Sequence, residues 1–142
     1  MTWPPSRKPA AKPKTPRRKN GSPEADLQKA VVQYLELALP KEAGVFWSAT
    51  LNGIRVSRGI RAGLRDQGLR PGVPDLVFIP LAGPRAGQTF WIELKAEKGR
   101  PTPEQDALMD VLFPAGRGAF ARSVHQVCAA LSAWGFPLRA HL

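Results

Sequence analysis

Apolar residues recur every three or four positions over residues 22–39, which is the pattern of a helix with one buried face. Ser22 suits the N-cap and Pro23 suits the first helical turn. The apolar stripe consists of Leu27, Val31, Tyr34, Leu35 and Ala38. At about 100° per residue, Glu24 falls within this stripe. We therefore expect the Glu24 side chain to point inward at the start of the helix.

Four further segments have the apolar and β-branched character of strands: Val45–Ala49, Asp75–Ile79, Thr89–Lys95 and Gly118–Arg122. The second and third of these are predicted to form an antiparallel pair, because only a Gly/Pro-rich stretch over residues 80–88 separates them. Residues 134–138 predict a short additional strand. Pro137 places that strand at a sheet edge, since proline donates no ladder hydrogen bond.

Three more helices are predicted between and after these strands. A short one runs from Ser57 to Gln67 and stops at Gly68. Residues 102–105 have the form of a capping box and open a helix to about Leu112, and residues 123–126 open another to about Ala133. The resulting order predicts an α/β fold, with a mixed central sheet of about four strands flanked by α-helices around one core.

The short helix over residues 57–67 carries a basic face. Arg58, Arg61 and Arg65 project to one side, and Ile60 and Leu64 project to the other. Such a face binds DNA phosphates or is simply a charged surface in water, and both interpretations stay open. The candidate DNA-binding residues are Arg55, Arg58, Arg61, Arg65, Lys98 and Arg100.

Charge divides the chain into two parts. Of a net charge of +10, seven Lys/Arg and no acid fall in residues 1–20, together with five prolines. We expect residues 1–21 to be a disordered basic arm, because so few apolar residues cannot offset the entropy of ordering. Residues 22–142 then form one domain with fourteen Lys/Arg and eleven Asp/Glu. The arm either contacts phosphates or serves as a solubilising tail.

Other function classes are excluded by what the sequence lacks. No apolar run reaches the ~18 residues of a membrane span, and the N-terminus has no secretory signal pattern. We expect a cytoplasmic protein without membrane association. The single cysteine, Cys128, is expected to pack within a helix, and the two histidines have no metal-ligand spacing.

The chemistry is concentrated in residues 71–95. Asp75 follows a Gly/Pro turn at the start of one strand, while Glu93 and Lys95 lie two residues apart on the next. Strand side chains alternate in direction, so Glu93 and Lys95 point to the same face. Two carboxylates and a cation suit metal-dependent phosphodiester cleavage, because hard divalent cations prefer carboxylate oxygens and the reacting phosphate needs a positive group nearby.

These residues carry a resemblance to a known family. Pro74-Asp75 followed by Glu93-Leu94-Lys95 resembles the signature of PD-(D/E)xK nucleases. Asn52-Gly53, Gly72-Val73-Pro74-Asp75-Leu76 and Pro103-Glu104-Gln105 together resemble the VRR-NUC branch of that superfamily, in particular its short stand-alone phage and bacterial members. The resemblance covers about residues 24–133. It implies a restriction-endonuclease-like core.

The resemblance also implies roles for single residues. Asp75 and Glu93 would bind Mg²⁺ or Mn²⁺, and Lys95 would contact the scissile phosphate or the attacking water. Glu24 matches an acid that completes the metal site in relatives, and the Leu94 carbonyl is a further candidate ligand. Gln105 matches a catalytic glutamine that would bond to Lys95 or the water; the alternative is a residue that only caps its helix.

The function that this resemblance implies is a metal-dependent DNA endonuclease. Relatives suggest branched DNA such as Holliday junctions as the substrate, a homodimer as the acting form, and a bacterial or phage-infected cell as the setting. Two alternatives stay open: a nuclease fold that only binds DNA, and a restriction-type or flap-type nuclease.

Overall fold

A computed structural model describes residues 22–54 and 56–142 of the chain. The predicted arm over residues 1–21 and the candidate DNA-binding residue Arg55 lie outside the described residues. The basic arm and the role of Arg55 therefore remain predictions from the sequence.

The four predicted helices and the first four predicted strands form with small shifts of their ends. The helices are α1 (Pro23–Ala38), α2 (Arg58–Asp66), α3 (Pro103–Leu112) and α4 (Val124–Ala133), and the strands are β1 (Val45–Ala49), β2 (Leu76–Pro80), β3 (Phe90–Leu94) and β4 (Gly118–Ala121). Two short 3₁₀ helices that the sequence did not predict, η1 (Lys41–Ala43) and η2 (Leu51–Gly53), flank β1. Ser22, Ser57, Thr102 and Ser123 each cap the helix that follows, accepting a hydrogen bond from a backbone N–H of its first turn.

The four strands form one mixed sheet in the order β1-β2-β3-β4. The first two pairings are antiparallel, as predicted for β2 and β3, and β4 runs parallel to β3. Leu76 lies opposite Ile92, so the start of β2 and the end of β3 meet at one end of the sheet. This register brings Asp75 to the segment that carries Glu93 and Lys95.

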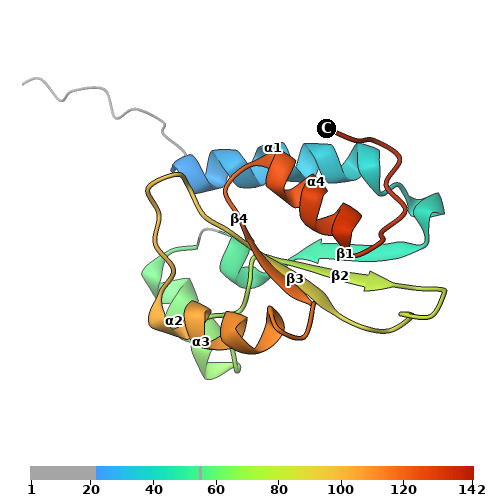
Figure 1. Ribbon diagram of the computed structural model, residues 1–142. Coiled ribbons are helices and arrows are strands. Elements are labelled where there is room, and N and C mark those ends of the chain that lie inside the picture. The colour runs from blue at the N-terminus through green and yellow to red at the C-terminus, as the bar shows by residue number, and fades with distance from the viewer. Residues whose placement is uncertain (1–21, 55) are drawn as a thin grey trace, which may run out of the picture.

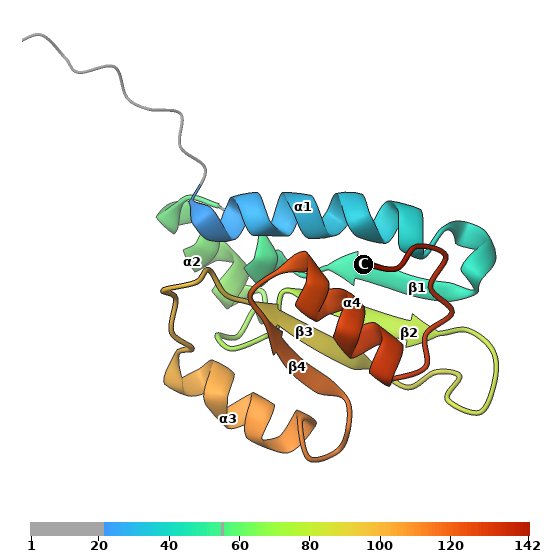
Figure 2. The ribbon, with the colours of Figure 1, turned by 45° about the horizontal axis from the view of Figure 1, so that its top comes forward.

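The helices lie on both sides of the sheet. Helices α1 and α4 pack side by side over one face, and α2 and α3 lie on the other side near one end, as Figures 1 and 2 show. The core is between the sheet and the α1–α4 layer, where Leu35, Phe78, Ile92 and Leu131 are fully buried. The mixed α/β fold predicted from the sequence is confirmed.

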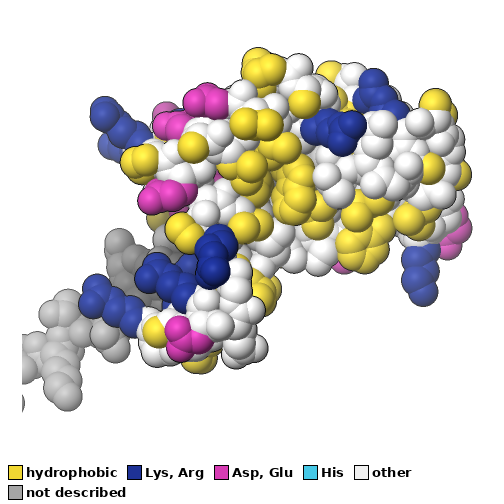
Figure 3. Space-filling model, turned by 90° about the horizontal axis from the view of Figure 1, so that it is seen from below, with side chains coloured by type: hydrophobic (Ala, Val, Ile, Leu, Met, Phe, Trp, Pro, Cys, Tyr) yellow, Lys and Arg dark blue, Asp and Glu magenta, His cyan; other side chains and the backbone are white. Residues whose placement is uncertain are grey.

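The opposite face of the sheet is only partly covered. Helix α3 packs closely there, since a Cβ placed on Gly118 would lie 2.5 Å from Leu112 Cβ and 2.7 Å from Met109 Sδ. Farther across the sheet, Phe46 of β1 is half exposed. Figure 3 shows a broad hydrophobic area on this face, with one group of Lys and Arg side chains at the lower left and others spread along the remaining edges.

The strand predicted over residues 134–138 is wrong. After α4 the chain turns at Gly135, whose φ is +79°, and buries Phe136 and Leu138. The Phe136 ring packs edge-on against Phe78 and Phe90, with centroids 6.0 and 5.1 Å away. Arg139 N–H then donates to the carbonyl of Ala38, at the end of α1. Burial of the aromatic ring outweighs strand pairing here, because Pro137 has no N–H for a ladder.

Candidate active site

Asp75 lies directly before β2 and is held in place by backbone groups of two neighbouring segments. The backbone N–H of Leu94 in β3 donates to Asp75 Oδ2 at 2.7 Å. On the other side, Thr50 N–H donates to the Asp75 carbonyl at 2.8 Å and Thr50 Oγ1 donates to the Pro74 carbonyl at 2.7 Å. The Leu94 N–H therefore fixes the orientation of the Asp75 carboxylate through Oδ2.

Glu93 and Lys95 are the buried charged residues among those described, with 3% and 7% of their surfaces exposed. Lys95 Nζ lies 3.4 Å from Glu93 Oε1, as expected for side chains that leave a strand on the same face. The backbone N–H of Lys95 extends the parallel ladder by donating to the Ala121 carbonyl. Burying charge is costly, and here a partner of opposite charge offsets part of that cost.

Gln105 combines the two roles that the sequence left as alternatives. Its backbone N–H and side-chain Oε1 complete a capping box with Thr102 at the start of α3. Its Nε2 donates to Glu93 Oε1 at 2.6 Å. Its partner is Glu93, whereas the resemblance implied Lys95 or the attacking water. A helix cap thus fixes a side chain that in turn fixes a buried carboxylate.

Both carboxyl groups are disposed to take up protons or a cation. Burial raises the pKa of Glu93 to about 8, and the negative charge of Asp75 adds to the rise. Burial also raises the pKa of Asp75 to about 6, against the opposing effects of the Leu94 N–H and Lys95. Each group favours the protonated form because it has lost water without gaining enough positive charge.

These residues fit a divalent cation. Glu93 Oε2 is fully buried and has no hydrogen-bond partner among the described residues, and it belongs to the carboxylate that repels Asp75. No three Asp, Glu, His or Cys side chains in the described part of the chain group closely enough to enclose a metal ion by themselves. Mg²⁺ is commonly bound by one or two carboxylates with water completing the shell. Asp75 and Glu93 are such a pair.

Glu24 lies beside this pair but binds Lys95. Its Oε1 is 3.5 Å from Lys95 Nζ, and nearly half of its side chain is exposed. The side chain reaches the site from the first turn of α1, although it is less buried than the sequence suggested. Leu94 lines the same hollow as Glu24 and Asp75. Metal ligation by Glu24 and by the Leu94 carbonyl remains a prediction.

The candidate DNA-binding residues are not equivalent. Arg58, Arg65, Lys98 and Arg100 are exposed, whereas Arg61 is half-buried and donates from Nη1 to Asn52 Oδ1 at 3.2 Å. Ile60, expected to pack on the opposite face of α2, is 58% exposed. Arg61 is therefore the arginine of α2 that turns towards Asp75, and the predicted basic face is divided.

Thr50, Asn52 and Gly72 help to build the site, but the sequence predicted none of their contacts. Asn52 and Gly72 were part of the motif resemblance, which was the available signal, and Thr50 had none. Gly72 has φ +91°, and a Cβ there would lie 2.9 Å from the backbone carbon and oxygen of Glu104. The turn before Asp75 therefore packs directly on the first turn of α3, which carries Gln105.

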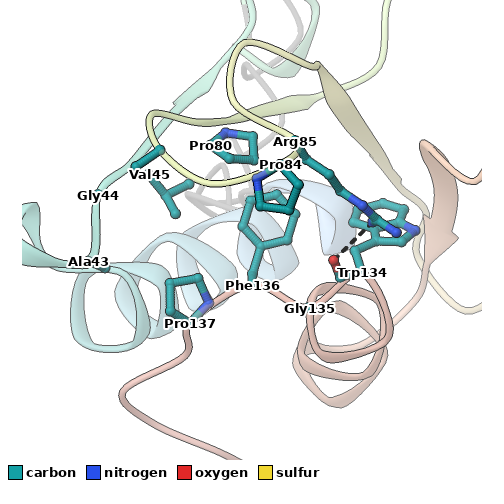
Figure 4. A pocket seen from close by; sticks show the side chains of 11 residues that line it. Ala43, Gly44, Val45, Pro80, Pro84, Arg85, Trp134, Gly135, Phe136 and Pro137 are labelled. Carbon is teal, nitrogen blue, oxygen red and sulfur yellow. Dashed lines mark hydrogen bonds between the residues drawn. The ribbon is translucent and has the colours of Figure 1, made fainter.

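The opposite end of the sheet holds a different kind of cavity. A volume of about 410 Å³ lies between the β2–β3 hairpin and the segment after α4, lined by Val45, Pro80, Pro84, Trp134, Phe136 and their neighbours (Figure 4). Arg85 is the charged residue of this lining. It donates from Nη1 to the Trp134 carbonyl at 3.0 Å and lies over the Phe90 ring. Arg85 of the β2–β3 hairpin is thus engaged within the fold.

Comparison with known proteins supports the fold. No protein-family model and no curated protein matches the sequence. A solved structure described as a VRR_NUC domain protein is similar to this chain, with a TM-score of 0.56 and 18% identity, over 83% of this chain and 92% of that one. No described helix is long and apolar enough to cross a membrane. The likeness confirms the fold predicted from the sequence: this chain shares the mixed α/β fold of that VRR_NUC domain protein.

Proposed function

We propose that this protein is a DNA endonuclease that hydrolyses phosphodiester bonds with Mg²⁺ or Mn²⁺ as cofactor. The observation that carries the proposal is the fully buried Glu93 Oε2, which has no hydrogen-bond partner among residues 22–54 and 56–142 and belongs to the carboxylate that contacts Lys95. A structural ion pair does not need a second buried carboxylate, because the added negative charge destabilises the fold. A cation-dependent hydrolase needs that charge.

Each residue of the site has a defined part in the proposed reaction. Asp75 and Glu93 would hold the cation, which when bound polarises the phosphate and lowers the pKa of the attacking water. Lys95, held by its contacts with Glu93 and Glu24, supplies a positive charge for the water or the scissile phosphate. Gln105 restrains Glu93, and the Leu94 N–H restrains Asp75. By resemblance to the superfamily, the products are a 5′-phosphate and a 3′-hydroxyl.

The exposed Lys and Arg residues around this site support DNA as the substrate, since phosphate contacts supply most of the affinity for a polyanion. We propose branched DNA, such as a Holliday junction, on the motif resemblance. A homodimer would present two sites to a two-fold junction. The corresponding location is the cytoplasm of a bacterial or phage-infected cell, which fractionation of such cells tests. Sedimentation of the purified protein, alone and with DNA, tests the dimer. Cutting by a protein that stays monomeric on DNA would contradict it.

The test of the activity is a cleavage assay with four-way junction, flap, single-stranded and linear duplex DNA in Mg²⁺, Mn²⁺ or EDTA. We expect metal-dependent cutting that falls at least about a hundredfold in Asp75→Asn and in Lys95→Ala. Glu97→Gln is the matched control, because Glu97 is an exposed acid just after β3 and contacts neither residue.

Full activity in both variants would contradict the mechanism. Binding of DNA without cutting in every metal would favour the alternative of a nuclease fold that acts as a binding module. Cutting confined to flaps or to linear duplex DNA would favour the flap-type or restriction-type alternative over a junction enzyme.

A further inference from the structure

Two hollows meet at Asp75. One, of about 210 Å³, extends along the start of α1, where Ser22, Glu24, Ala25 and Gln28 line it. The other, of about 200 Å³, extends along the turn before Asp75 and the start of α3, where Gly72, Thr102 and Gln105 line it. Each is smaller than the ~300 Å³ at which pockets for drug-sized ligands begin. Each therefore suits a unit the size of a sugar phosphate.

Three residues line both hollows: Asn52, Arg61 and Asp75. Among the described residues, Arg61 is the Lys or Arg that lines either of them, while Glu24 and Glu104 add negative charge. An anionic phosphate that enters either hollow needs a positive group that faces it. Within the part of the chain that the structure describes, the guanidinium of Arg61 is the positive group at the junction of the two hollows.

Asn52 fixes Arg61 relative to Asp75. Its Oδ1 accepts from Arg61 Nη1 at 3.2 Å, and its Nδ2 donates to the carbonyls of Arg70 at 3.1 Å and Val73 at 3.5 Å. The amide could not be reversed, because its NH₂ group would then face the guanidinium and its oxygen would face two carbonyls. One side chain thus joins helix α2 to the turn that leads into Asp75.

We propose that Arg61 binds the phosphate next to the scissile one on the same strand, and that Asn52 is the positioning residue that holds Arg61 there. This inference rests on the proposed nuclease function. The site then engages sugar-phosphate units on both sides of the bond that it cuts, one in each hollow. Arg58 and Arg65, which are exposed, contribute less specific contacts to the DNA backbone.

A substrate with one neutral linkage tests this contact. A methylphosphonate replaces a charged phosphate oxygen with a methyl group, and it is placed in turn at each phosphate that flanks the cleaved bond. At one position we expect it to lower kcat/KM of the wild-type protein about tenfold to a hundredfold, the range for a hydrogen bond to a charged group. In Arg61→Ala the same linkage should lower kcat/KM by less than about twofold relative to the unmodified DNA. The same holds for Arg61→Gln, which keeps a polar side chain in the hollow.

Two matched variants separate this role from general effects. Arg65→Ala removes a charge from the same helix and should keep the wild-type sensitivity to the neutral linkage. Thr50→Val removes a hydrogen bond to the turn before Asp75 without contacting Arg61, and it should also keep that sensitivity. Asn52→Ala should lose it, because Arg61 then has no fixed position.

Equilibrium binding of the same DNA by fluorescence anisotropy without metal ions gives a readout independent of cutting. The neutral linkage should weaken binding by the wild-type protein and leave binding by Arg61→Ala unchanged. Equal sensitivity of both proteins at every flanking position would overturn the proposal. Loss of this sensitivity in Arg65→Ala but not in Arg61→Ala would also overturn the proposal. Failure of the protein to cut any DNA would defeat the nuclease function, while the binding comparison would still decide the role of Arg61.

Discussion

The two ends of the sheet use opposite kinds of residues, although the same strands build both. At the end where β2 begins, the hollows are about 210 and 200 Å³, and Asp75 and Arg61 line both of them. The buried charges of Glu93 and Lys95 belong to the same end of the sheet. At the other end a cavity of about 410 Å³ is lined mostly by proline, aliphatic and aromatic groups. The larger cavity has its one charged lining residue, Arg85, already engaged. We place the proposed active site at the first end because of its buried charge, and not because of cavity size.

The largest expected effect concerns the apolar end. Phe136→Ala should lower the free energy of unfolding by about 3–5 kcal/mol, because the ring packs against Phe78, Phe90 and Trp134. Urea denaturation measures this loss, and Pro137→Ala, at an exposed neighbour, is the control. Cutting by the folded fraction should stay near the wild-type level. A selective loss of cutting in a stably folded Phe136→Ala protein would break the division between the two ends.

At the charged end, the folded protein should be less stable when Glu93 is ionised than when it is protonated or replaced by glutamine. In metal-free protein the pKa of Glu93 is about 8, against 4.5 for an ordinary glutamate, so the folded state holds the extra proton between these values. Stability should therefore fall as the pH rises through this window. Glu93→Gln should remove most of this slope and stabilise the metal-free protein above pH 8 by about 1–3 kcal/mol.

Urea denaturation in EDTA at pH 6 and at pH 9 measures the difference, with Glu97→Gln as the exposed control. If the free energy of unfolding depends on pH in Glu93→Gln as it does in the wild-type protein, burial does not destabilise the ionised form of Glu93. Stabilisation combined with loss of cutting would sharpen the comparison, because it would show that the site exchanges stability for reactivity.

Gly72 and Gly68 provide a matched pair at the active-site end. Both have positive φ, +91° and +106°, but only a Cβ on Gly72 would meet the backbone of Glu104, at 2.9 Å. Gly68→Ala should cost about 1–2 kcal/mol of backbone strain. Gly72→Ala should cost more and should also lower cutting, since the first turn of α3 must shift. Thermal unfolding and the cleavage assay measure both effects. Equal losses of stability and cutting in Gly68→Ala and Gly72→Ala would show that the packing of the turn on α3 has no part in the site.

The smallest expected effect is that of Arg85→Ala. The guanidinium bonds the Trp134 carbonyl and lies 5.7 Å from the Phe90 centroid, but the residue is exposed. We expect a loss of less than about 1 kcal/mol in stability and no change in the salt dependence of DNA binding. A flatter salt dependence would show that the apolar end also contacts DNA and would weaken the contrast between the two ends.

Much of the fold could be read from local patterns. The caps at Ser22, Ser57 and Thr102 and the apolar stripe of α1 placed helices to within about a residue or two, since these signals act over a few neighbouring positions. The segment over residues 134–138 was misjudged because its burial depends on Phe78 and Phe90, which are distant in sequence. The same limit applies to Ile60, whose exposure depends on what lies near α2.

The sequence by itself determined the mixed α/β fold, the antiparallel pair β2–β3 and the placement of Asp75, Glu93 and Lys95 at one end of it. Strand alternation and short connections are local properties, so they can be read without coordinates. Only the tertiary structure decided that Gln105 bonds Glu93, that Glu24 binds Lys95, and that Asn52 draws Arg61 to Asp75. Such contacts join segments separated by loops, and their partners depend on how whole elements pack.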